Sequence, residues 1–199
     1  APPPSEAPAT APSEAPTGAK EGTNAEPPGE PPALALLDSA GTAVDPLRDA
    51  PDGTKAVVVV FARTDCPISN RYVPQWNEIA ERYTPQGVTF HVVYADPDET
   101  VEGIEAHHVE FAYATPWLRD VDQDLARWSG AIVTPEALVY VPGVGAVYRG
   151  RIDDRYVAFG KARRQAANHD LDDTLRAVLD GRPPAFRTTE AVGCAIRLL

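Results

Sequence analysis

The chain has 199 residues, 43% of them hydrophobic, which is enough for one ordinary hydrophobic core. Its formal net charge of -11 excludes nucleic acid and anionic membrane surfaces as partners, because both require clustered Lys and Arg. No run approaches the roughly 18 to 20 apolar residues that cross a bilayer, so we expect no membrane-spanning segment.

Residues 1–32 differ in composition from the rest of the chain. They contain ten prolines, set among small and polar residues, and no large apolar side chain. Such a stretch buries too little surface to offset its ordering entropy, so we expect a disordered Pro/Ala/Glu-rich tether. The chain starts at Ala1 without Met, as after removal of a secretory signal or a lipid-anchor leader. We therefore expect an extracytoplasmic protein, periplasmic or tethered to a membrane by its N-terminus.

Regular patterning runs from residue 33 to residue 182, the predicted folded domain. Short apolar stretches around the turn at 39–42 predict a hairpin, and the β-branched runs 56–61 and 88–94 are typical of strands buried on both faces. Two more strands are predicted at 136–141 and 146–149. Helical spacing predicts four helices, at 67–83, about 98–113, about 122–129 and about 170–179. This alternation predicts an α/β fold, followed by a C-terminal tail over 183–199 that carries Cys194.

Cys66 lies between the strand at 56–61 and the first turn of the helix that follows. At such a position the helix dipole and the free backbone N–H groups stabilise a thiolate, which is the nucleophilic form of cysteine. The sequence therefore predicts that Cys66 is a reactive thiol.

The surroundings of Cys66 resemble the thioredoxin superfamily. The resemblance rests on the buried strand, the run Cys66-Pro67-Ile68-Ser69, a proline eight residues after the cysteine, and Thr134-Pro135 before a later strand. Within that superfamily the chain is similar to the bacterial redoxins grouped with alkyl hydroperoxide reductase and thiol-specific antioxidant proteins. The resemblance implies a thioredoxin-like fold, in which a central mixed sheet carries helices on both faces and an N-terminal hairpin extends it. It also implies a cis Pro135 that faces the active cysteine.

The sequence departs from the superfamily pattern at two points. Ser69 stands where thioredoxins have the second cysteine of Cys-x-x-Cys, so fast local resolution of a mixed disulfide is absent. Peroxiredoxins place a threonine three residues before the reactive cysteine, and a proline four residues before that threonine. Here Thr64 is two residues before Cys66, and Val59 holds the proline position.

Two further kinds of residue are candidates for the site. An arginine near the thiol would favour the thiolate, and Arg151 or Arg149 is the preferred candidate by fold position, ahead of Arg63 and Arg71. Cys194 has three open interpretations. It is a resolving thiol, a metal ligand beside Cys66, or an inert thiol in a tail.

Histidine decides how far a metal site is supported, because copper sites in thioredoxin-fold assembly factors combine two cysteines with one histidine. His91 and His108 are predicted to lie in the core, and His107 is predicted to face solvent. His169 starts the last helix and is the candidate third ligand with Cys66 and Cys194.

Three functions remain open. The first is a thiol redox enzyme, without a cofactor, in which Cys66 attacks a protein disulfide or a peroxide and Cys194 or an external thiol resolves the adduct. The second is a copper-binding or metal-site assembly module. The third is a non-catalytic interaction domain that keeps the fold.

Overall fold

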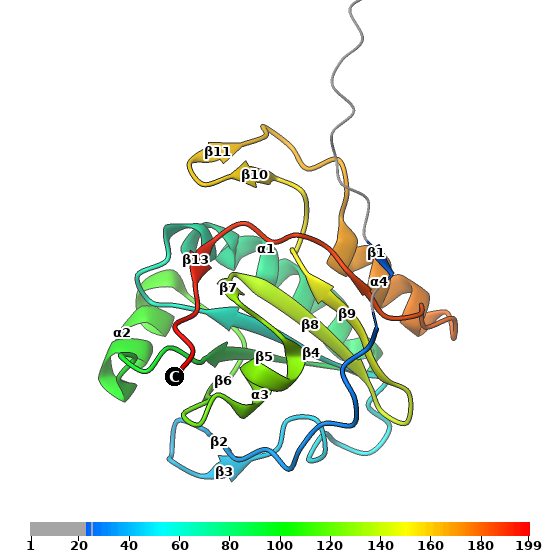
Figure 1. The fold of residues 1–199 in the computed structure, drawn as a ribbon, viewed down its shortest axis with the longest axis horizontal. Coiled ribbons are helices and arrows are strands. Elements are labelled where there is room, and N and C mark those ends of the chain that lie inside the picture. Colours follow the sequence, from blue (N-terminus) through cyan, green and yellow to red (C-terminus); the bar gives the residue numbers. More distant parts are fainter. Residues whose placement is uncertain (1–22, 25) are drawn as a thin grey trace, which may run out of the picture.

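The computed structural model describes Thr23–Asn24 and residues 26–199, so the first 22 residues of the predicted tether and residue 25 lie outside the described residues. In the described part, a mixed sheet of nine strands has the order β1-β12-β9-β8-β4-β5-β6-β2-β3 (Figure 1). Two small sheets pair β10 with β11 and β13 with β7.

The strands have the following bounds: β1 (Thr23–Asn24), β2 (Leu36–Leu37), β3 (Ala43–Val44), β4 (Ala56–Ala62), β5 (Val88–Tyr94), β6 (Trp117–Arg119), β7 (Val133–Thr134), β8 (Glu136–Val141), β9 (Gly145–Gly150), β10 (Tyr156–Ala158), β11 (Lys161–Ala162), β12 (Arg187–Thr188) and β13 (Cys194–Ala195). The helices are α1 (Pro67–Tyr83), the short 3-10 helix η1 (Thr84–Gln86), α2 (Val101–Phe111), α3 (Asp124–Ser129) and α4 (Asp170–Leu179). None of the helices in the described residues is long and apolar enough to cross a membrane.

The central strand β4 is buried along its whole length, as its β-branched run predicts. It lies parallel to β5 and antiparallel to β8, with Val59 opposite His91 on one side and Leu138 on the other. Because successive side chains of a strand point to opposite faces, β4 supplies two cores. Val58 and Val60 belong to one buried cluster, and the neighbouring strand positions belong to the other.

Helices cover both faces of the sheet, which confirms the thioredoxin-like architecture predicted from the sequence. On one face, apolar residues of α1, α2 and α4 pack in a single cluster that includes Trp76 and Leu175. On the other face, Leu125 of α3 packs with Leu36 of the N-terminal hairpin and with Ile196 near the C-terminus. The predicted helices 67–83 and 170–179 have the observed bounds of α1 and α4.

The last residues of the predicted tether lie against the domain. Thr23–Asn24 pairs with β12, and the Trp128 indole donates to the Gly29 carbonyl at 2.8 Å. The Arg48 guanidinium donates to the carbonyls of Pro31 and Pro32. In the described part, the contacts of the folded domain therefore begin before residue 33, because carbonyl groups of the Pro-rich segment accept hydrogen bonds from side chains of the domain.

The tail after α4 also forms part of the fold. Its first strand, β12, extends the main sheet by pairing parallel with β9, and its second strand, β13, crosses to β7 (Figure 1). Phe186 and Ile196 are buried on the α3 face. The C-terminal segment thus brings Cys194 from the far end of the sequence across the sheet.

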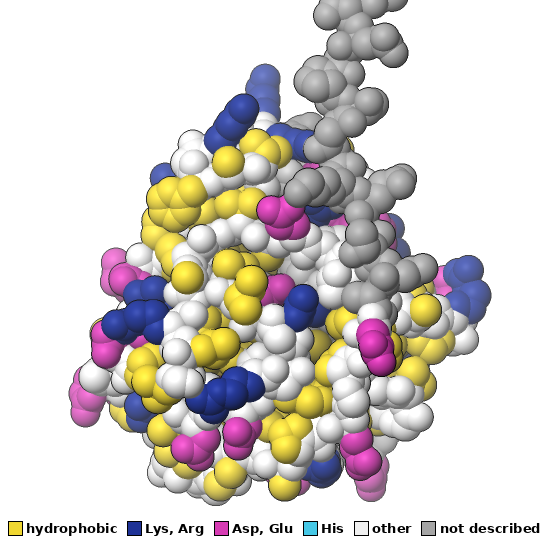
Figure 2. All heavy atoms as spheres, in the orientation of Figure 1, with side chains coloured by type: hydrophobic (Ala, Val, Ile, Leu, Met, Phe, Trp, Pro, Cys, Tyr) yellow, Lys and Arg dark blue, Asp and Glu magenta, His cyan; other side chains and the backbone are white. Residues whose placement is uncertain are grey.

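Acidic and basic side chains are interspersed over this face of the molecule (Figure 2).

Candidate active site

Cys66 is the N-cap of α1, immediately after the turn that leaves β4. Its backbone N–H donates to the Arg63 carbonyl at 3.2 Å, and Pro67 occupies the first turn of the helix, where a missing N–H costs nothing. The Ser69 N–H points at the Cys66 sulfur at 3.5 Å. The predicted strand, cysteine and helix order is therefore present, and it directs unpaired N–H groups of the helix start toward the thiol.

The loop before β8 faces Cys66 from the other side. The Thr134-Pro135 peptide bond is cis, as the resemblance implied. The Cys66 thiol donates to the Thr134 carbonyl at 3.1 Å, and both residues are almost completely buried. Cys66, Thr134 and Pro135 are thus brought together as predicted.

Cys194 completes the group through the pairing of β13 with β7. In this antiparallel pair Cys194 lies opposite Thr134, whose hydroxyl donates to the Cys194 carbonyl at 3.4 Å. The neighbouring Ile196 N–H donates to the Ile132 carbonyl at 2.9 Å. Both cysteines are free thiols that meet at Thr134, because Cys194 lies opposite this residue and the Cys66 thiol donates to its carbonyl.

Gly193 is required by the close approach of the tail to this loop. A Cβ atom at position 193 would lie 1.8 Å from the Thr134 carbonyl oxygen, well inside any real contact. Any other residue there would have to move the tail or the loop. The glycine before Cys194 therefore has a steric reason.

The two thiols have opposite acid–base character. Burial is the largest influence on the pKa of Cys66 and opposes ionisation, but hydrogen bonds from Cys194, from Ser69 and from Thr134 together lower that pKa below its ordinary value. Burial, and then the hydrogen bond and charge of Cys66, raise the pKa of Cys194 to about 12. Cys66 is therefore the more acidic thiol of the pair, and Cys194 keeps its proton.

Ser69 is a candidate site residue that the sequence showed only as a missing cysteine. The residue is 2% exposed, and its hydroxyl has no hydrogen-bond partner among the described residues, so it is free to turn toward Cys66, whose pKa it helps to lower. Its position three residues after an N-cap cysteine could have indicated this from the sequence, because residues of the first helical turn face the N-cap side chain.

Arg63 is the arginine that acts on the cysteine pair. Its guanidinium donates to the Ala195 carbonyl at 3.1 Å and to Asp65 at 3.0 Å, and its charge lowers the pKa of Cys194. Glu99, which the sequence reasoning did not single out, accepts from the Thr64 N–H at 2.8 Å and so fixes the loop that carries Arg63 and Asp65.

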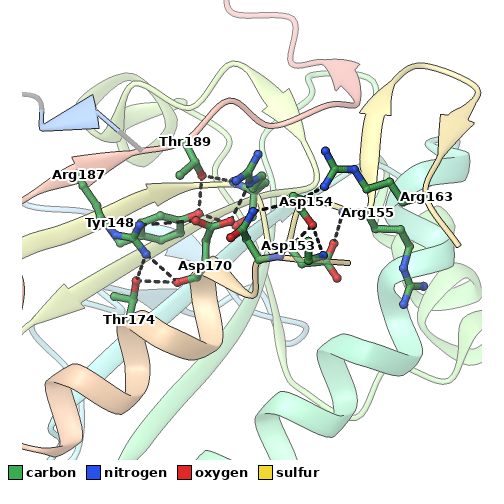
Figure 3. Close-up of polar contacts among 12 residues, drawn as sticks. Tyr148, Asp153, Asp154, Arg155, Arg163, Asp170, Thr174, Arg187 and Thr189 are labelled. Atoms are coloured by element: carbon green, nitrogen blue, oxygen red, sulfur yellow. Dashed lines mark hydrogen bonds and ion pairs between the residues drawn. The ribbon is translucent and has the colours of Figure 1, made fainter. Parts of the chain in front are cut away.

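The preferred arginine candidates are bonded elsewhere. Arg151 donates to Asp170 at 2.7 Å. Asp170 also forms an ion pair with Arg187, and both residues belong to the buried polar cluster drawn in Figure 3. Arg149 donates to the Ser129 carbonyl and forms an ion pair with Glu136. Both guanidinium groups are thus bound by partners that connect the end of β9 to α4 and to the loop after α3. The expectation that Arg151 lies beside the thiol is not met.

The histidines do not complete a metal site. His169 lines a cavity of about 630 Å³ beside α1 and α4, together with Arg71 and Arg176 but with neither cysteine. In the described part of the chain, no group of three or more His, Cys, Asp or Glu side chains is placed to hold a metal ion. The predicted set of Cys66, Cys194 and His169 is therefore not assembled.

The prediction that His107 faces solvent is wrong. His107 is buried, and its ring nitrogens bond to the Tyr94 hydroxyl and to Asn70 Oδ1, each at 2.8 Å. Burial lowers the pKa of His107 to about 4, so the ring is neutral. Because Asn70 Nδ2 in turn donates to the Thr64 carbonyl, His107 supports the loop in front of Cys66.

The mixed sheet, the N-cap cysteine and the facing cis-proline loop define a thioredoxin-like redoxin. A model of the AhpC/TSA family matches residues 30–151, and the chain therefore belongs to the AhpC/TSA family. A comparison with curated proteins found no match.

Solved structures with the same fold include two that align with nearly the whole chain. An uncharacterized conserved protein from Geobacillus kaustophilus has a TM-score of 0.68 at 25% identity, covering 90% of this chain and 96% of that one. A hypothetical protein from Sinorhizobium meliloti 1021 has a TM-score of 0.70 at 26% identity, with coverages of 90% and 99%. The thioredoxin domain of a thiol-disulfide oxidoreductase from Bacteroides vulgatus shares the fold, with a TM-score of 0.57 at 18% identity and coverages of 78% and 99%.

Proposed function

We propose that the protein is a thiol–disulfide oxidoreductase that acts on disulfides of other proteins, with Cys66 as nucleophile and Cys194 as resolving thiol. The observation that carries the proposal is the pair itself. Two free thiols meet at Thr134, one with a lowered pKa and one with a raised pKa. A thiolate beside a protonated thiol is the arrangement that disulfide exchange needs.

In the first step, the Cys66 thiolate attacks one sulfur of a partner disulfide. The partner S–S bond breaks, its second sulfur leaves as a thiolate, and a mixed disulfide joins Cys66 to the partner. The Cys194 thiol then gives up its proton to a departing thiolate and attacks the Cys66 sulfur. The Cys66–Cys194 disulfide forms, the partner leaves with both cysteines reduced, and an external dithiol returns the pair to the reduced form.

Because residue 69 is a serine, the role of resolving thiol in this scheme falls to Cys194. With a serine at the usual position of the second cysteine, the helix itself supplies no resolving thiol, and Cys194 is the other cysteine of the chain. We extend the proposal to an extracytoplasmic location, because a cysteine pair that cycles through a disulfide suits a compartment where disulfides persist.

The test is the reduction of oxidised insulin by the full chain, with dithiothreitol as reductant. We expect turnover in the wild-type protein and none above background for Cys66→Ser. Pre-reduced Cys194→Ser protein, mixed with insulin after dithiothreitol has been removed, should trap a mixed disulfide with insulin. Retention of full turnover by Cys66→Ser would refute the proposal. Consumption of hydrogen peroxide without any reduction of insulin would also overturn it, in favour of a thiol peroxidase.

A further inference from the structure

Cys66 is inaccessible in the structure, with an exposed fraction of 0%. Disulfide exchange requires the partner disulfide to approach the attacking sulfur directly, so a partner must first remove what covers it. The C-terminal tail is part of that cover, because Val192 and Cys194 pack against the buried cluster that contains Cys66. Figure 1 shows β13 lying across the loop that carries β7.

The tail covers the thiol by pairing its backbone with β7 as an extended strand. Cys194 lies opposite Thr134, and the pairing continues to Ile196 and Ile132. The same Thr134 carbonyl that faces Cys194 accepts the hydrogen bond of the Cys66 thiol. A strand placed on β7 in this register therefore delivers a cysteine to Cys66, whichever chain the strand comes from.

The contacts that hold the tail are mainly polar. Arg197, whose side chain is half exposed, forms ion pairs with the buried Asp96 and the exposed Asp98, and the buried Gln123 bonds to backbone groups of Arg197 and Leu199. Beyond Gly193, only Ile196 is buried in this segment. One half-exposed arginine, one buried apolar side chain and a two-residue strand hold this segment, so it is suited to opening without unfolding the domain.

We infer that residues 192–196 occupy β7 as a substrate-like strand, which covers the Cys66 thiol until an extended strand of the partner protein displaces it. The inference rests on the proposed function and names its partner class: an extended polypeptide with a disulfide-bonded cysteine. The register adds a sequence preference. The residue before the docked cysteine lies where Gly193 lies, within reach of the Thr134 carbonyl, so the preferred partner sequence is Gly-Cys.

Strand exchange orders the chemistry. The partner strand replaces the tail and forms the mixed disulfide with Cys66, as written above. The tail then pairs again with β7, brings Cys194 to the Cys66 sulfur, and expels the partner as a thiol. Each step conserves one disulfide between the two proteins, and no oxidant other than the partner disulfide is needed.

The first test measures how fast iodoacetamide alkylates Cys66 in a Cys194→Ser background, where Cys66 is the one remaining thiol. Gly193→Ala places a methyl group against the Thr134 carbonyl, and Arg197→Ala removes the ion pairs, so each should raise the rate at least tenfold. Gly29→Ala and Arg182→Ala are matched controls, since a Cβ at 29 meets open space and Arg182 pairs only with exposed Asp180. Unchanged rates in both tail variants, with circular dichroism showing them folded, would overturn the inference.

The second test uses two synthetic peptides with the sequences Glu-Ala-Val-Gly-Cys-Ala-Ile and Glu-Ala-Val-Val-Cys-Ala-Ile, each carrying thionitrobenzoate on its cysteine. With the Cys194→Ser protein, the Gly-Cys peptide should release thionitrobenzoate at least tenfold faster. Equal rates would overturn the docking register. Alkylation needs no substrate, so the two proposals can fail separately. Faster alkylation in the tail variants without any insulin turnover would refute the proposed function alone. Insulin turnover with unchanged alkylation rates would refute only the strand exchange.

Discussion

Replacing Ser69 with Ala removes one donor from the Cys66 thiolate and leaves the backbone N–H of residue 69 in place. A hydrogen bond to a charged group contributes about 1.5 to 3 kcal/mol. The lower end applies here, because sulfur is a weak acceptor. Since about 1.4 kcal/mol is a factor of about 10 in an equilibrium constant, the variant should hold about tenfold less thiolate at a pH below the pKa of Cys66.

The reaction rate should change less than the thiolate population. The direction of the rate change caused by Ser69→Ala should reverse with pH. A more basic thiolate is a better nucleophile, by roughly threefold for a tenfold change in acidity. Ser69→Ala should therefore react about threefold more slowly below the pKa of Cys66 and about threefold faster well above it.

The assay for this crossover is the pH profile of exchange with 5,5′-dithiobis(2-nitrobenzoate) in the Cys194→Ser background. Ser129→Ala is the matched control, because Ser129 is equally buried but donates to the Ala126 carbonyl, and its profile should overlay that of the parent. A constant ratio between Ser69→Ala and its parent at every pH would show that the hydroxyl affects access rather than ionisation, and would refute this reasoning.

Three further outcomes follow from the same contacts. Cys66→Ser removes a hydrogen bond and a charge that help raise the pKa of Cys194, so peptide mapping should show faster alkylation of Cys194 at pH 8 than in the wild type, and an equal or slower rate would contradict the assignment. Trp76→Phe should cost about 1 to 3 kcal/mol in urea unfolding, because the lost indole N–H leaves the buried Thr115 hydroxyl unpaired; a change within error would show that Thr115 finds another partner. Burial opposes ionisation of Asp154, but hydrogen bonds from two backbone N–H groups and one side chain, with the charge of Arg163, outweigh it and lower the pKa of this carboxyl. The ionised form is thus favoured in the folded state, and its stabilisation is present above the ordinary pKa of 3.8 and lost as the pH falls through the lowered value. Asp154→Asn should be less stable than the wild type at pH 7, with the gap closing in acid; a gap that persists at pH 2 would contradict this sign.

The sequence was sufficient where a long pattern has one structural solution. The continuous β-branched run of β4 has to be covered on both faces, and the spacing of apolar residues in α1 requires a helix between Pro67 and Tyr83. Cys66 was found because its place between these two elements is itself a sequence feature. Cis-Pro135 was found through the family resemblance, since propensity alone does not identify it.

The remainder of the site depends on contacts between distant segments. Strands β7 and β13 have two residues each, which is too short for any periodicity to register. Which arginine lies near the thiols depends on how the tail crosses the sheet. The tail brings Ala195 to Arg63, whereas Arg151 is bound to Asp170. His107 was misplaced because positions three and four residues after Ile104 both border the apolar stripe of α2, and the helix rotation that buries His107 is set by its partners.

The buried thiol pair imposes a relation between reactivity and access. With the tail docked, Cys194 helps to lower the pKa of Cys66, but the sulfur has no exposed surface. Under the proposed displacement, the sulfur opens to a partner, keeps the influence of Ser69 and of the helix start on its pKa, and loses that of Cys194. Under the proposed exchange, the free protein therefore keeps its more acidic thiol where oxidants cannot reach it, and presents a more basic, more nucleophilic sulfur to its partner. A partner strand that forms its own hydrogen bonds with β7 would offset the loss of the tail, so the proposal favours partners that dock as strands over small disulfides that do not.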